Sequence, residues 1–421
     1  MPIAHQGVLM SEHVPAPTAN RPLAGVRVVE CGVWHAGPGA SAILADLGAE
    51  VIKIESMDGD PERYHGSFGP MALGMADREH WNLLFEMSNR NKRAMCLNIT
   101  TVEGKEILHQ LVREADVFLT NLRTSTKPKL GIDYESLKVV NPEIVHVNVS
   151  GFGPEGPFAD AGGFDPMGQA ISGMMFLSGK PEPSVLQVIV LDQLAAITAS
   201  HAAITALYAR ERNGEGQEVH VSLYGSALWL MHANLLQTSL RGTDLDVSWE
   251  RLNNPFSRTT FECGDGHWIM GTNHPEEKYW ARFCEAVGLP EIATDPRFDT
   301  KEKRVEVNAE LISLFDAQFK LRPRAEWLEI MREKNVLFAP INTTQDVVND
   351  EQALVNGYLT DYDHPYLGQV RIPGYPVRFS SYEAGPRTPA PDLGQHTDDI
   401  LAELGLSPAE VTRLRGAEVV R

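Results

Sequence analysis

The sequence predicts an α/β fold in which helices cover a mostly parallel sheet, and three observations support this fold class. A short β-rich run at residues 23–32 is followed by a helix of small residues and by a second strand that ends at residue 55. The same alternation of strand and helix recurs through residues 93–153. A long apolar helix at residues 194–212 then precedes another strand. Strands that alternate with helices form βαβ units, in which the strands lie parallel.

The periodicity of apolar residues gives the elements of the first half. Residues 93–99 (RAMCLNI) and 116–122 (DVFLTNL) are short apolar runs typical of buried strands. Residues 101–115 between them have the spacing of an amphipathic helix. Residues 143–153 (EIVHVNVSGFG) predict a further strand of the same sheet.

The long apolar helix organises the next stretch of the chain. Residues 194–212 are rich in helix formers and apolar on most faces, which predicts a largely buried helix. The run VIVL at residues 188–191 reads as a strand that ends directly before Asp192. The segment NGEGQ at residues 213–217 predicts a turn, and residues 218–236 predict a strand that leads into another helix.

The length of the chain predicts two domains, because 421 residues exceed one ordinary core. We expect a flexible tail at residues 1–21, a large α/β domain at 22–224, a smaller α+β domain at 225–335 and a C-terminal segment at 336–421 that returns to the large domain. A hairpin pattern around GDGH, residues 264–267, marks the smaller domain.

The composition is that of a globular protein, with 43% hydrophobic and 22% charged residues. A formal net charge of −19 repels polyanions, which argues against general binding of nucleic acids or of anionic membranes. The four cysteines lie far apart with no CxxC pair, so they predict neither a zinc site nor a disulfide framework. With no secretion signal and no apolar run of the roughly 20 residues that span a bilayer, the sequence predicts a soluble cytoplasmic protein.

The sequence lacks the spacings of several familiar sites. No GxGxxG directly follows the first strand, and the sequence contains no GxxxxGK[ST], HExxH or GxSxG motif, which disfavours dinucleotide, nucleoside triphosphate, zinc-protease and serine-hydrolase sites. The first β–α turn reads CGVWHAGPGAS, residues 31–41, whose glycines allow close approach of the backbone to a ligand.

Seven segments between residues 22 and 407 carry a resemblance to one family. They are PLAGVRVVE with GPGASAILADLGAEVIKIE (22–30 and 37–55), NRNKRAMCLNITTVEGKEIL (89–108), ADVFLTNLR with KLGIDYESL (115–123 and 129–137), NPEIVHVNVSGFGPEGP (141–157), GFDPMGQAISG (163–173), LDQLAAITASHAAITALYARERNGEGQEVHVSLYGSAL (191–228) and PAPDLGQHTDDILAELGLS (389–407). With these segments in order, the chain resembles the class III CoA-transferases, whose relatives include formyl-CoA transferase, carnitine CoA-transferase and α-methylacyl-CoA racemase.

The resemblance implies a Rossmann-like large domain, completed by the C-terminal segment, and a smaller domain inserted between its parts. It also implies an interlocked homodimer, in which each chain threads through the ring of the other. The implied activity moves CoA from an acyl-CoA donor to a carboxylic acid acceptor. CoA is then a substrate, and the reaction needs no metal and no permanently bound cofactor.

By this resemblance Asp192 is the catalytic aspartate, although Leu191 stands where the family has a glycine. The residues support the role independently. An Asp between a strand and a helix N-terminus lies at the carboxyl edge of a parallel sheet, where such folds bind ligands, and the helix N-terminus favours the ionised form. An ionised carboxylate can attack a thioester and take up CoA as an aspartyl thioester. The alternative is that Asp192 only caps the helix.

The resemblance gives His35, Phe164 and Asp165 supporting places in the active site. His35 falls where the transferases place a polar residue facing the thioester carbonyl, and its alternative is a loop histidine without a task. Phe164 stands where the racemase branch has a proton-exchanging histidine, and Phe cannot exchange a proton. Asp165 is either an acidic residue near the active site or the start of an Asx-turn before a proline.

The register of the resemblance also implies a binding surface for CoA. It places Leu97 and Thr100 beside the adenine, Asn121 and Leu122 at the pantetheine entrance, and Lys129 at a phosphate.

The phosphates of CoA require cationic groups gathered at one face. The densest basic stretches of the N-terminal half are residues 90–93, with Arg90, Lys92 and Arg93, and residues 123–129. A basic run is also often a solvated surface. Ser56 stands where the family has an arginine, so one phosphate contact has no assigned residue.

CoA transfer is the leading interpretation, and two alternatives remain. A racemase-like isomerase needs an acid/base pair that Phe164 removes, whereas a non-catalytic CoA-binding protein has no use for a nucleophile at Asp192. The acyl groups cannot be read from the motifs, because acyl specificity depends on the shapes of loops.

Overall fold

The computed structural model describes residues 20–421 except positions 66, 69–70, 73, 76–77, 181, 246–250, 252–253 and 258. The predicted tail therefore lies outside the described residues up to residue 19. The chain forms two compact units. The larger unit contains the described residues up to Ser178, Pro183–Leu245 and Thr360–Arg421, and the smaller unit contains those of Gly179–Glu182 and Asp246–Leu359.

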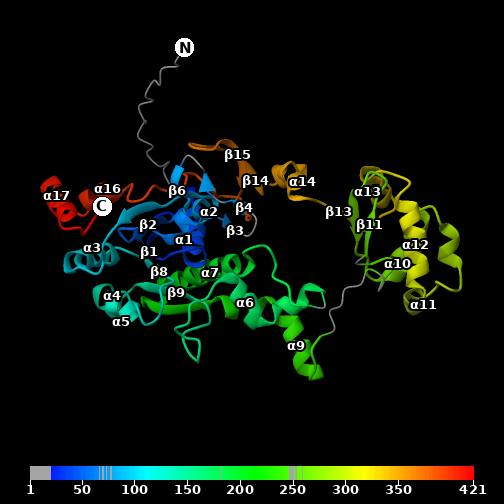
Figure 1. Ribbon diagram of the computed structural model, residues 1–421, viewed down its shortest axis with the longest axis horizontal. Coiled ribbons are helices and arrows are strands. Elements are labelled where there is room, and N and C mark those ends of the chain that lie inside the picture. Colours follow the sequence, from blue (N-terminus) through cyan, green and yellow to red (C-terminus); the bar gives the residue numbers. More distant parts are fainter. Residues whose placement is uncertain are drawn as a thin grey trace, which may run out of the picture. The chain divides into compact units, whose positions relative to one another are not determined.

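A six-stranded parallel sheet forms the centre of the larger unit (Figure 1). Its strands lie in the order β10–β9–β8–β1–β2–β7, and all neighbouring pairs are parallel. Their bounds are Arg27–Cys31 (β1), Glu50–Glu55 (β2), Arg93–Cys96 (β7), Val117–Thr120 (β8), Val145–Ser150 (β9) and Gln217–Ser222 (β10). The α/β prediction is confirmed. Because the winding direction reverses between β1 and β8, their carboxyl ends flank the point where doubly wound sheets bind ligands.

Helices cover both faces of this sheet. Val28 and Val117 point to one face, and their chain neighbours Val29 and Phe118 point to the other, as the two-residue period of a strand requires. The first face packs against α1 (Ala36–Asp46) and α7 (Val190–Asn213). The second face packs against α3 (Val102–Arg113), α5 (Tyr134–Val140), α16 (Thr397–Glu403) and α17 (Pro408–Gly416).

Helices α1 and α7 meet closely because small residues form their contact. A Cβ atom at Gly39 of α1 would lie 3.1 Å from the Cβ of Ala196 on α7. Ala195, Ala196 and Ala199 are fully buried in the core. By length and composition α7 is also the one helix of the described residues that could cross a membrane, a property that buried core helices share.

The strand predicted at residues 188–191 is wrong. Helix α7 begins at Val190, Ile189 is its N-cap, and Asp192 is its third residue. The cause is the carboxylate of Asp165, which accepts hydrogen bonds from the backbone N–H groups of Leu191 and Asp192 and thereby supports a helical first turn.

Further elements complete the larger unit. They are β3 (Ser67–Phe68), β4 (Met71–Ala72), β5 (Gly74–Met75), β6 (Arg78–Asn82), α2 (Leu83–Asn89), α4 (Lys127–Leu130), α6 (Asp165–Ser172), α8 (Leu223–Leu230), α9 (His232–Arg241), β14 (Leu359–His364) and β15 (Gly368–Pro373). Helix α8 packs against α6 and α7, so the domain boundary proposed at residue 225 falls within this unit.

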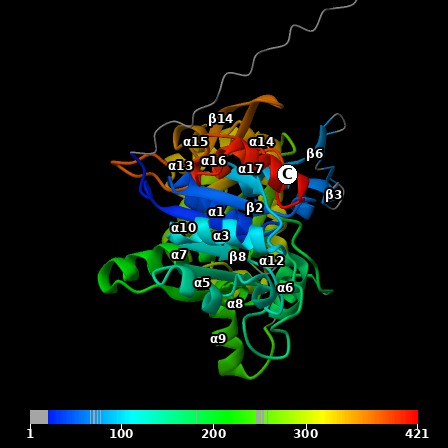
Figure 2. The same ribbon diagram turned by 90° about the vertical axis from the view of Figure 1, so that its left-hand side faces the viewer.

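The C-terminal segment, whose helices α16 and α17 are labelled in Figure 2, contacts the sheet at its edge strand β7. The N–H of His396 donates to the carbonyl of Ala94 at 3.0 Å, and the N–H of Asn98 donates to the carbonyl of Val419 at 2.8 Å. Leu97 and Val420 form an isolated antiparallel bridge. The last residues of the chain therefore lie next to the loop that follows β7.

The smaller unit has its own antiparallel sheet and aromatic core. Its strands are β11 (Thr259–Glu262), β12 (Trp268–Gly271) and β13 (Phe338–Ile341), and β11 and β12 form the predicted hairpin. Its helices are α10 (Glu276–Ala286), α11 (Lys301–Glu306), α12 (Asn308–Phe319), α13 (Arg324–Glu333), α14 (Thr344–Val348) and α15 (Glu351–Val355). At its centre the ring of Phe319 stacks on Phe261 and lies tilted against Phe283.

Candidate active site

The first turn of α7 is held by a carboxylate from a different helix. Ile189 offers no side-chain cap, so the N–H groups of Leu191 and Asp192 donate to Asp165 Oδ2, at 2.5 and 3.1 Å. The amide of Gln169 donates to Asp165 Oδ1. Asp165 is 4% exposed and begins α6. Its side chain therefore orients α7 and does not form a local Asx-turn.

Leu191 fits this arrangement as a helical residue. It is fully buried, and a Cβ atom at Gly168 of α6 would lie 2.8 Å from its Cδ1. The absence of a side chain at Gly168 thus makes room for Leu191. A glycine before Asp192 is not needed for the backbone here, because the position lies inside a regular helix.

Asp192 is the third residue of α7 and not its N-cap, so the capping interpretation is wrong. Its carboxyl is largely removed from water, and this burial, with the nearby charge of Asp165, raises its pKa to about 7. Close to neutral pH the group is thus divided between its protonated and ionised forms. A carboxylate with this pKa is more nucleophilic than one that is fully solvated.

We expect the rate of transfer to follow the ionisation of Asp192. Only the carboxylate can attack a thioester, so kcat/KM should rise about tenfold per pH unit below the pKa of about 7 and level off above it. A pH profile under subsaturating acyl-CoA measures this. A plateau that already begins near the ordinary Asp pKa of 3.8 would contradict it.

His35 lies at the start of α1 and faces the start of α7. Its Nε2 is 2.8 Å from Gln193 Oε1, and its Nδ1 is 2.7 Å from Ser88 Oγ. Burial lowers the pKa of His35 to about 4, although the hydrogen bond to Gln193 opposes this shift. The ring is therefore neutral at neutral pH and lies next to the residue that follows Asp192.

Trp34, which directly precedes His35, contacts a second aromatic residue. The rings of Trp34 and Phe164 meet edge to face with their centroids 5.6 Å apart. Trp34 has a left-handed backbone with φ of +61°, and its N–H donates to Asp60 Oδ1 at 3.0 Å. Such a conformation in a bulky residue is strained and persists only where surrounding contacts fix it. The sequence alone does not indicate a role for Trp34, because its strained conformation is visible only in the folded backbone.

A buried network of charges supports the β1–α1 loop. Glu30 accepts hydrogen bonds from Lys53 at 2.8 Å and from Lys92 at 2.6 Å, and Lys53 also donates to Asp60 at 2.9 Å and to the carbonyl of Gly32 at 3.0 Å. Glu30 and both lysine side chains are fully buried. The two lysines hold the pKa of Glu30 at about 2 although its burial acts to raise it.

The basic stretch at residues 90–93 is occupied by ion pairs within the protein. Lys92 binds Glu30, Arg90 pairs with Asp46 at 2.5 Å, and Arg93 pairs with Glu403 at 2.7 Å. Its interpretation as a phosphate-binding run therefore finds no support in these contacts.

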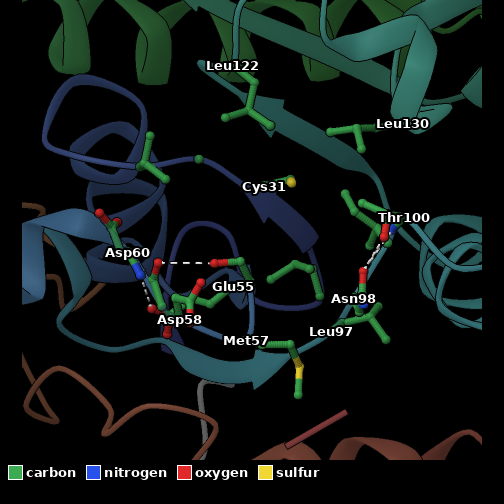
Figure 3. A pocket seen from close by; sticks show the side chains of 16 residues that line it. Cys31, Glu55, Met57, Asp58, Asp60, Leu97, Asn98, Thr100, Leu122 and Leu130 are labelled. Carbon is green, nitrogen blue, oxygen red and sulfur yellow. Dashed lines mark hydrogen bonds between the residues drawn. The ribbon is translucent and has the colours of Figure 1, made fainter. Parts of the chain in front are cut away.

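A cavity of about 410 Å³ opens at the carboxyl ends of β1, β2, β7 and β8 (Figure 3). Leu122 and Leu130 lie on one side of it and Met57 and Leu97 on the other. Of the five residues predicted to bind CoA, Leu97, Thr100 and Leu122 line this cavity. Cys31 also lines it, and burial raises the pKa of its thiol to about 12, so it does not act as a thiolate.

The other two predicted residues lie next to the cavity without lining it. The amide of Asn121 accepts from the N–H of Val33 at 2.9 Å and donates to the carbonyl of Val33 at 2.6 Å, so it holds the β1–α1 loop. Lys129 is exposed and precedes Leu130. Among the described residues no three His, Cys, Asp or Glu side chains gather as a metal site requires.

A residue from the far end of the sequence, Arg421, contacts the cavity wall from outside without lining the cavity. Arg421 Nη1 donates to the carbonyl of Met57 at 3.3 Å, and Met57 lines the cavity. Met57 directly follows Ser56 in the chain. Ser56 is the position at which the family resemblance leads us to expect an arginine. No local pattern relates these positions, because 364 residues separate Arg421 from Met57.

The sequence matches CoA-transferase family III over residues 23–397. It is 33% identical over 406 residues to the succinyl-CoA–D-citramalate CoA-transferase of Chloroflexus aurantiacus, which covers 95% of this chain and 98% of that protein. It is 31% identical over 404 residues to the (R)-2-hydroxy-4-methylpentanoate CoA-transferase of Clostridioides difficile. This alignment covers 95% of this chain and 99% of that protein. A solved CAIB/BAIF family protein from Brucella suis has a TM-score of 0.81 at 32% identity, covering 91% of this chain and 100% of that one.

Proposed function

The chain belongs to CoA-transferase family III and transfers CoA between an acyl-CoA donor and a carboxylic acid acceptor, and we propose that Asp192 carries the CoA in transit. The observation that supports Asp192 most is its placement: a partly buried carboxyl with its pKa raised to about 7, on a helix turn that Asp165 holds in place. A group of this kind suits covalent catalysis near neutral pH.

In the proposed reaction the ionised Asp192 adds to the thioester carbonyl of the donor and expels the CoA thiolate, which leaves a mixed anhydride. The thiolate then attacks the Asp192 carbonyl, so the donor acid departs as a carboxylate and Asp192 holds CoA as a thioester. The acceptor carboxylate attacks that thioester and forms a second anhydride. The thiolate finally attacks the acceptor carbonyl, which releases the new CoA ester and restores Asp192.

His35 is proposed to stabilise the charge that develops on the thioester oxygen. Its neutral ring places Nε2 beside Gln193, the neighbour of Asp192. A neutral N–H donor in a buried site stabilises an oxyanion without adding a competing charge. Phe164, whose ring contacts Trp34, holds no exchangeable proton, which favours transfer over the racemase-like alternative.

The function is tested with a panel of acyl-CoA donors and acids in deuterated water, followed by mass analysis. Because two relatives are named for (R)-2-hydroxy-4-methylpentanoate and D-citramalate, the acceptors begin with 2-hydroxy acids. The expected product is the CoA ester of the acceptor, with no deuterium at the α-carbon of a chiral 2-methylacyl-CoA. Deuterium uptake without transfer would indicate the isomerase, and neither product would indicate a binding protein.

For CoA itself we propose that the adenine lies against Leu97 and Thr100 and that the pantetheine passes Leu122. Lys129 and Arg421 are the proposed phosphate contacts, since Arg421 reaches the loop after Ser56. We expect Arg421→Ala to raise KM for acyl-CoA roughly tenfold with kcat little changed, as loss of a charge-assisted hydrogen bond does. The matched control is Arg413→Ala on α17, whose side chain pairs with Glu103.

Esters of 3′-dephospho-CoA identify which phosphate Arg421 contacts. If it contacts the 3′-phosphate, the variant and the wild type should have the same KM for the dephosphorylated ester. An unchanged KM for both esters in Arg421→Ala would contradict the contact.

We also propose the homodimer that the family resemblance implies. Helices α8 and α9 expose large apolar side chains, with Trp229 80% and Leu240 79% exposed. Exposed apolar surface of this kind marks protein contacts. Sedimentation should therefore give a dimer. Because threaded chains cannot separate while folded, Trp229→Asp with Leu240→Asp should give monomers when the variant is refolded from urea. A monomeric wild type would contradict the proposal.

A further inference from the structure

The amide of Gln169 joins α6 to the segment that leads into α7. Gln169 is fully buried and follows Asp165 by one helical turn. Its Nε2 donates to Asp165 Oδ1 at 2.5 Å and to the carbonyl oxygen of Leu186 at 3.4 Å. Its Oε1 accepts from the N–H of Leu186 at 2.9 Å. The side chain therefore uses both of its N–H donors and its oxygen.

These contacts fix the direction in which the amide points. The N–H of Leu186 needs an acceptor, so it must face Oε1 and not the NH₂ group of Gln169. Nε2 then faces Asp165, whose carboxylate accepts its hydrogen. The opposite orientation would set a donor against the N–H of Leu186 and an oxygen against the carboxylate of Asp165. Gln169 therefore presents a donor to Asp165.

The partners of the Asp165 carboxyl are all donors. Its Oδ1 accepts from Gln169, and its Oδ2 accepts from the N–H groups of Leu191 and Asp192. The ionised form of Asp165, which only accepts, matches all three donors. Gln169 thus holds the Asp165 carboxylate in one orientation, and this carboxylate holds the first turn of α7.

The burial of side chains contributes little to the position of the chain that enters α7. The side chains of residues 186–188 are exposed, so they bury little apolar surface. The helix also has no side-chain cap of its own. The stretch is instead bound to α6 at both ends, because Gln169 binds Leu186 and Asp165 binds the N–H of Asp192. Since Gln169 also binds Asp165, its loss would weaken both attachments.

We propose that Gln169 is a positioning residue for CoA transfer, because it fixes the Asp165 carboxylate and the entry of α7 and thereby the placement of Asp192. The inference rests on the proposed role of Asp192 as the nucleophile. Gln169 itself touches no reacting atom in this scheme. Displacement of a reacting group by about 1 Å can cost roughly a hundredfold in rate, which is the effect expected when Gln169 is lost.

The first test replaces Gln169 by Met, which has a similar length and donates no hydrogen bond. Gln169→Met should lower kcat about a hundredfold and change KM for acyl-CoA by less than about twofold, because other elements line the CoA cavity. The matched control is Ser172→Ala, which is also buried on α6 and whose hydroxyl donates to the carbonyl of Gln169. The control should keep the wild-type kcat. An equal loss of kcat in both variants would overturn the inference.

Gln169→Glu tests the donor and not the shape of the side chain. The new carboxyl still accepts from Leu186, but it repels the Asp165 carboxylate unless the two groups share a proton. The ratio of variant kcat to wild-type kcat should therefore fall as the pH rises and the shared proton is lost. Asp192 and His35, which sense the charge of Asp165, are present in both proteins, so the ratio isolates the new carboxyl. A ratio that does not change with pH would overturn the inference.

Urea unfolding shows whether each variant is folded. If Gln169→Met is not folded, Gln169→Glu supplies the comparison by itself. At low pH its shared proton restores the donor to Asp165, so the same protein is compared with and without that hydrogen bond.

Trapping of Asp192 separates this inference from the proposed function. Each protein is mixed with an acyl-CoA donor and hydroxylamine, and the rate at which Asp192 becomes a hydroxamate is followed by peptide mass. Gln169→Met should form the hydroxamate about a hundredfold more slowly than the wild type does. A wild-type rate would overturn the role of Gln169 and leave Asp192 as the nucleophile. A wild type that forms no hydroxamate at Asp192 would instead overturn the proposed function.

Discussion

Replacing Asp192 by Asn or Ala should abolish CoA transfer, with turnover expected to fall by about four orders of magnitude or more. Neither side chain can form the anhydride or the thioester, and we expect no other carboxylate to take the place of Asp192. Asp165 is the nearest acidic neighbour by its charge, but both of its oxygens already accept hydrogen bonds from Gln169 and from α7. Steady-state turnover with the best donor and acceptor measures the loss.

The same Asn variant should be more stable than the wild type at alkaline pH. Because burial raises the pKa of Asp192 to about 7, the folded protein binds this proton more tightly than the unfolded chain does. Its contribution to stability is complete below the ordinary pKa of 3.8 and is lost as the pH rises through 7. Asn carries no charge and avoids this loss. Urea unfolding at roughly pH 5 and pH 9 measures the difference.

The matched control is Asp398→Asn in the first turn of α16. Asp398 is an exposed residue that pairs with Arg415. It should change neither turnover nor the pH dependence of stability by a measurable amount. Near-normal transfer in Asp192→Asn would remove Asp192 from the mechanism. A variant with lower stability than the wild type at high pH would contradict the account of its burial.

Glu30→Gln should lower the free energy of unfolding by about 3 to 5 kcal/mol, as happens when one partner of a buried ion pair is removed. Glu30 is the carboxylate that Lys92 and Lys53 share, and both ammonium groups are fully buried. Lys53 keeps Asp60, whereas Lys92 keeps only the oxygens of Pro38 and Asn89. Burial already lowers the pKa of Lys92 to about 8. Without the charge of Glu30, burial favours the neutral amine of Lys92 still more.

A double variant shows whether unpaired charge is the cause. Lys92→Met removes the stranded ammonium, so Glu30→Gln with Lys92→Met should recover part of the loss, and the two effects should not add. The measurement is urea unfolding of both single variants and the double variant. Strictly additive losses would mean that packing, and not charge, explains the effect of Glu30.

The sheet was predictable because its signal is local. Each strand is a short apolar run, and each helix has its own periodicity, so β1, β7, β8 and β9 could be placed from the sequence. The run at residues 188–191 has the same apolar character but became the entry to α7. What decides its conformation is the Asp165 carboxylate, 26 residues earlier in the chain. The sequence pattern around residues 188–191 does not reveal this distant hydrogen-bond partner.

The site was predictable only where a motif marks it. Asp192 and Asp165 lie on segments of the family pattern, His35 is placed by the register between two of them, and the structure brings the three to the start of α7. The residues that tune them come from elsewhere. Ser88, whose Oγ lies 2.7 Å from His35 Nδ1, is 53 residues away from it in the chain, so no spacing relates them.

The ion pairs of the basic residues could not be predicted from the sequence either. Lys92 and Arg90 read as a solvated or phosphate-binding run, but their partners Glu30 and Asp46 are 62 and 44 residues away. Charge counted along the chain cannot distinguish a binding surface from an internal network. Only the positions of the counter-ions do.

The most direct test of the central claim is to trap CoA on Asp192. Protein is mixed with an acyl-CoA donor without acceptor, hydroxylamine is added, and peptides are mapped by mass. Because hydroxylamine attacks activated carboxyl groups, the account predicts that Asp192 becomes a hydroxamate, that activity is lost, and that hydroxylamine without donor does neither. A hydroxamate at Asp165 with none at Asp192, or no adduct with any donor that supports transfer, would contradict it.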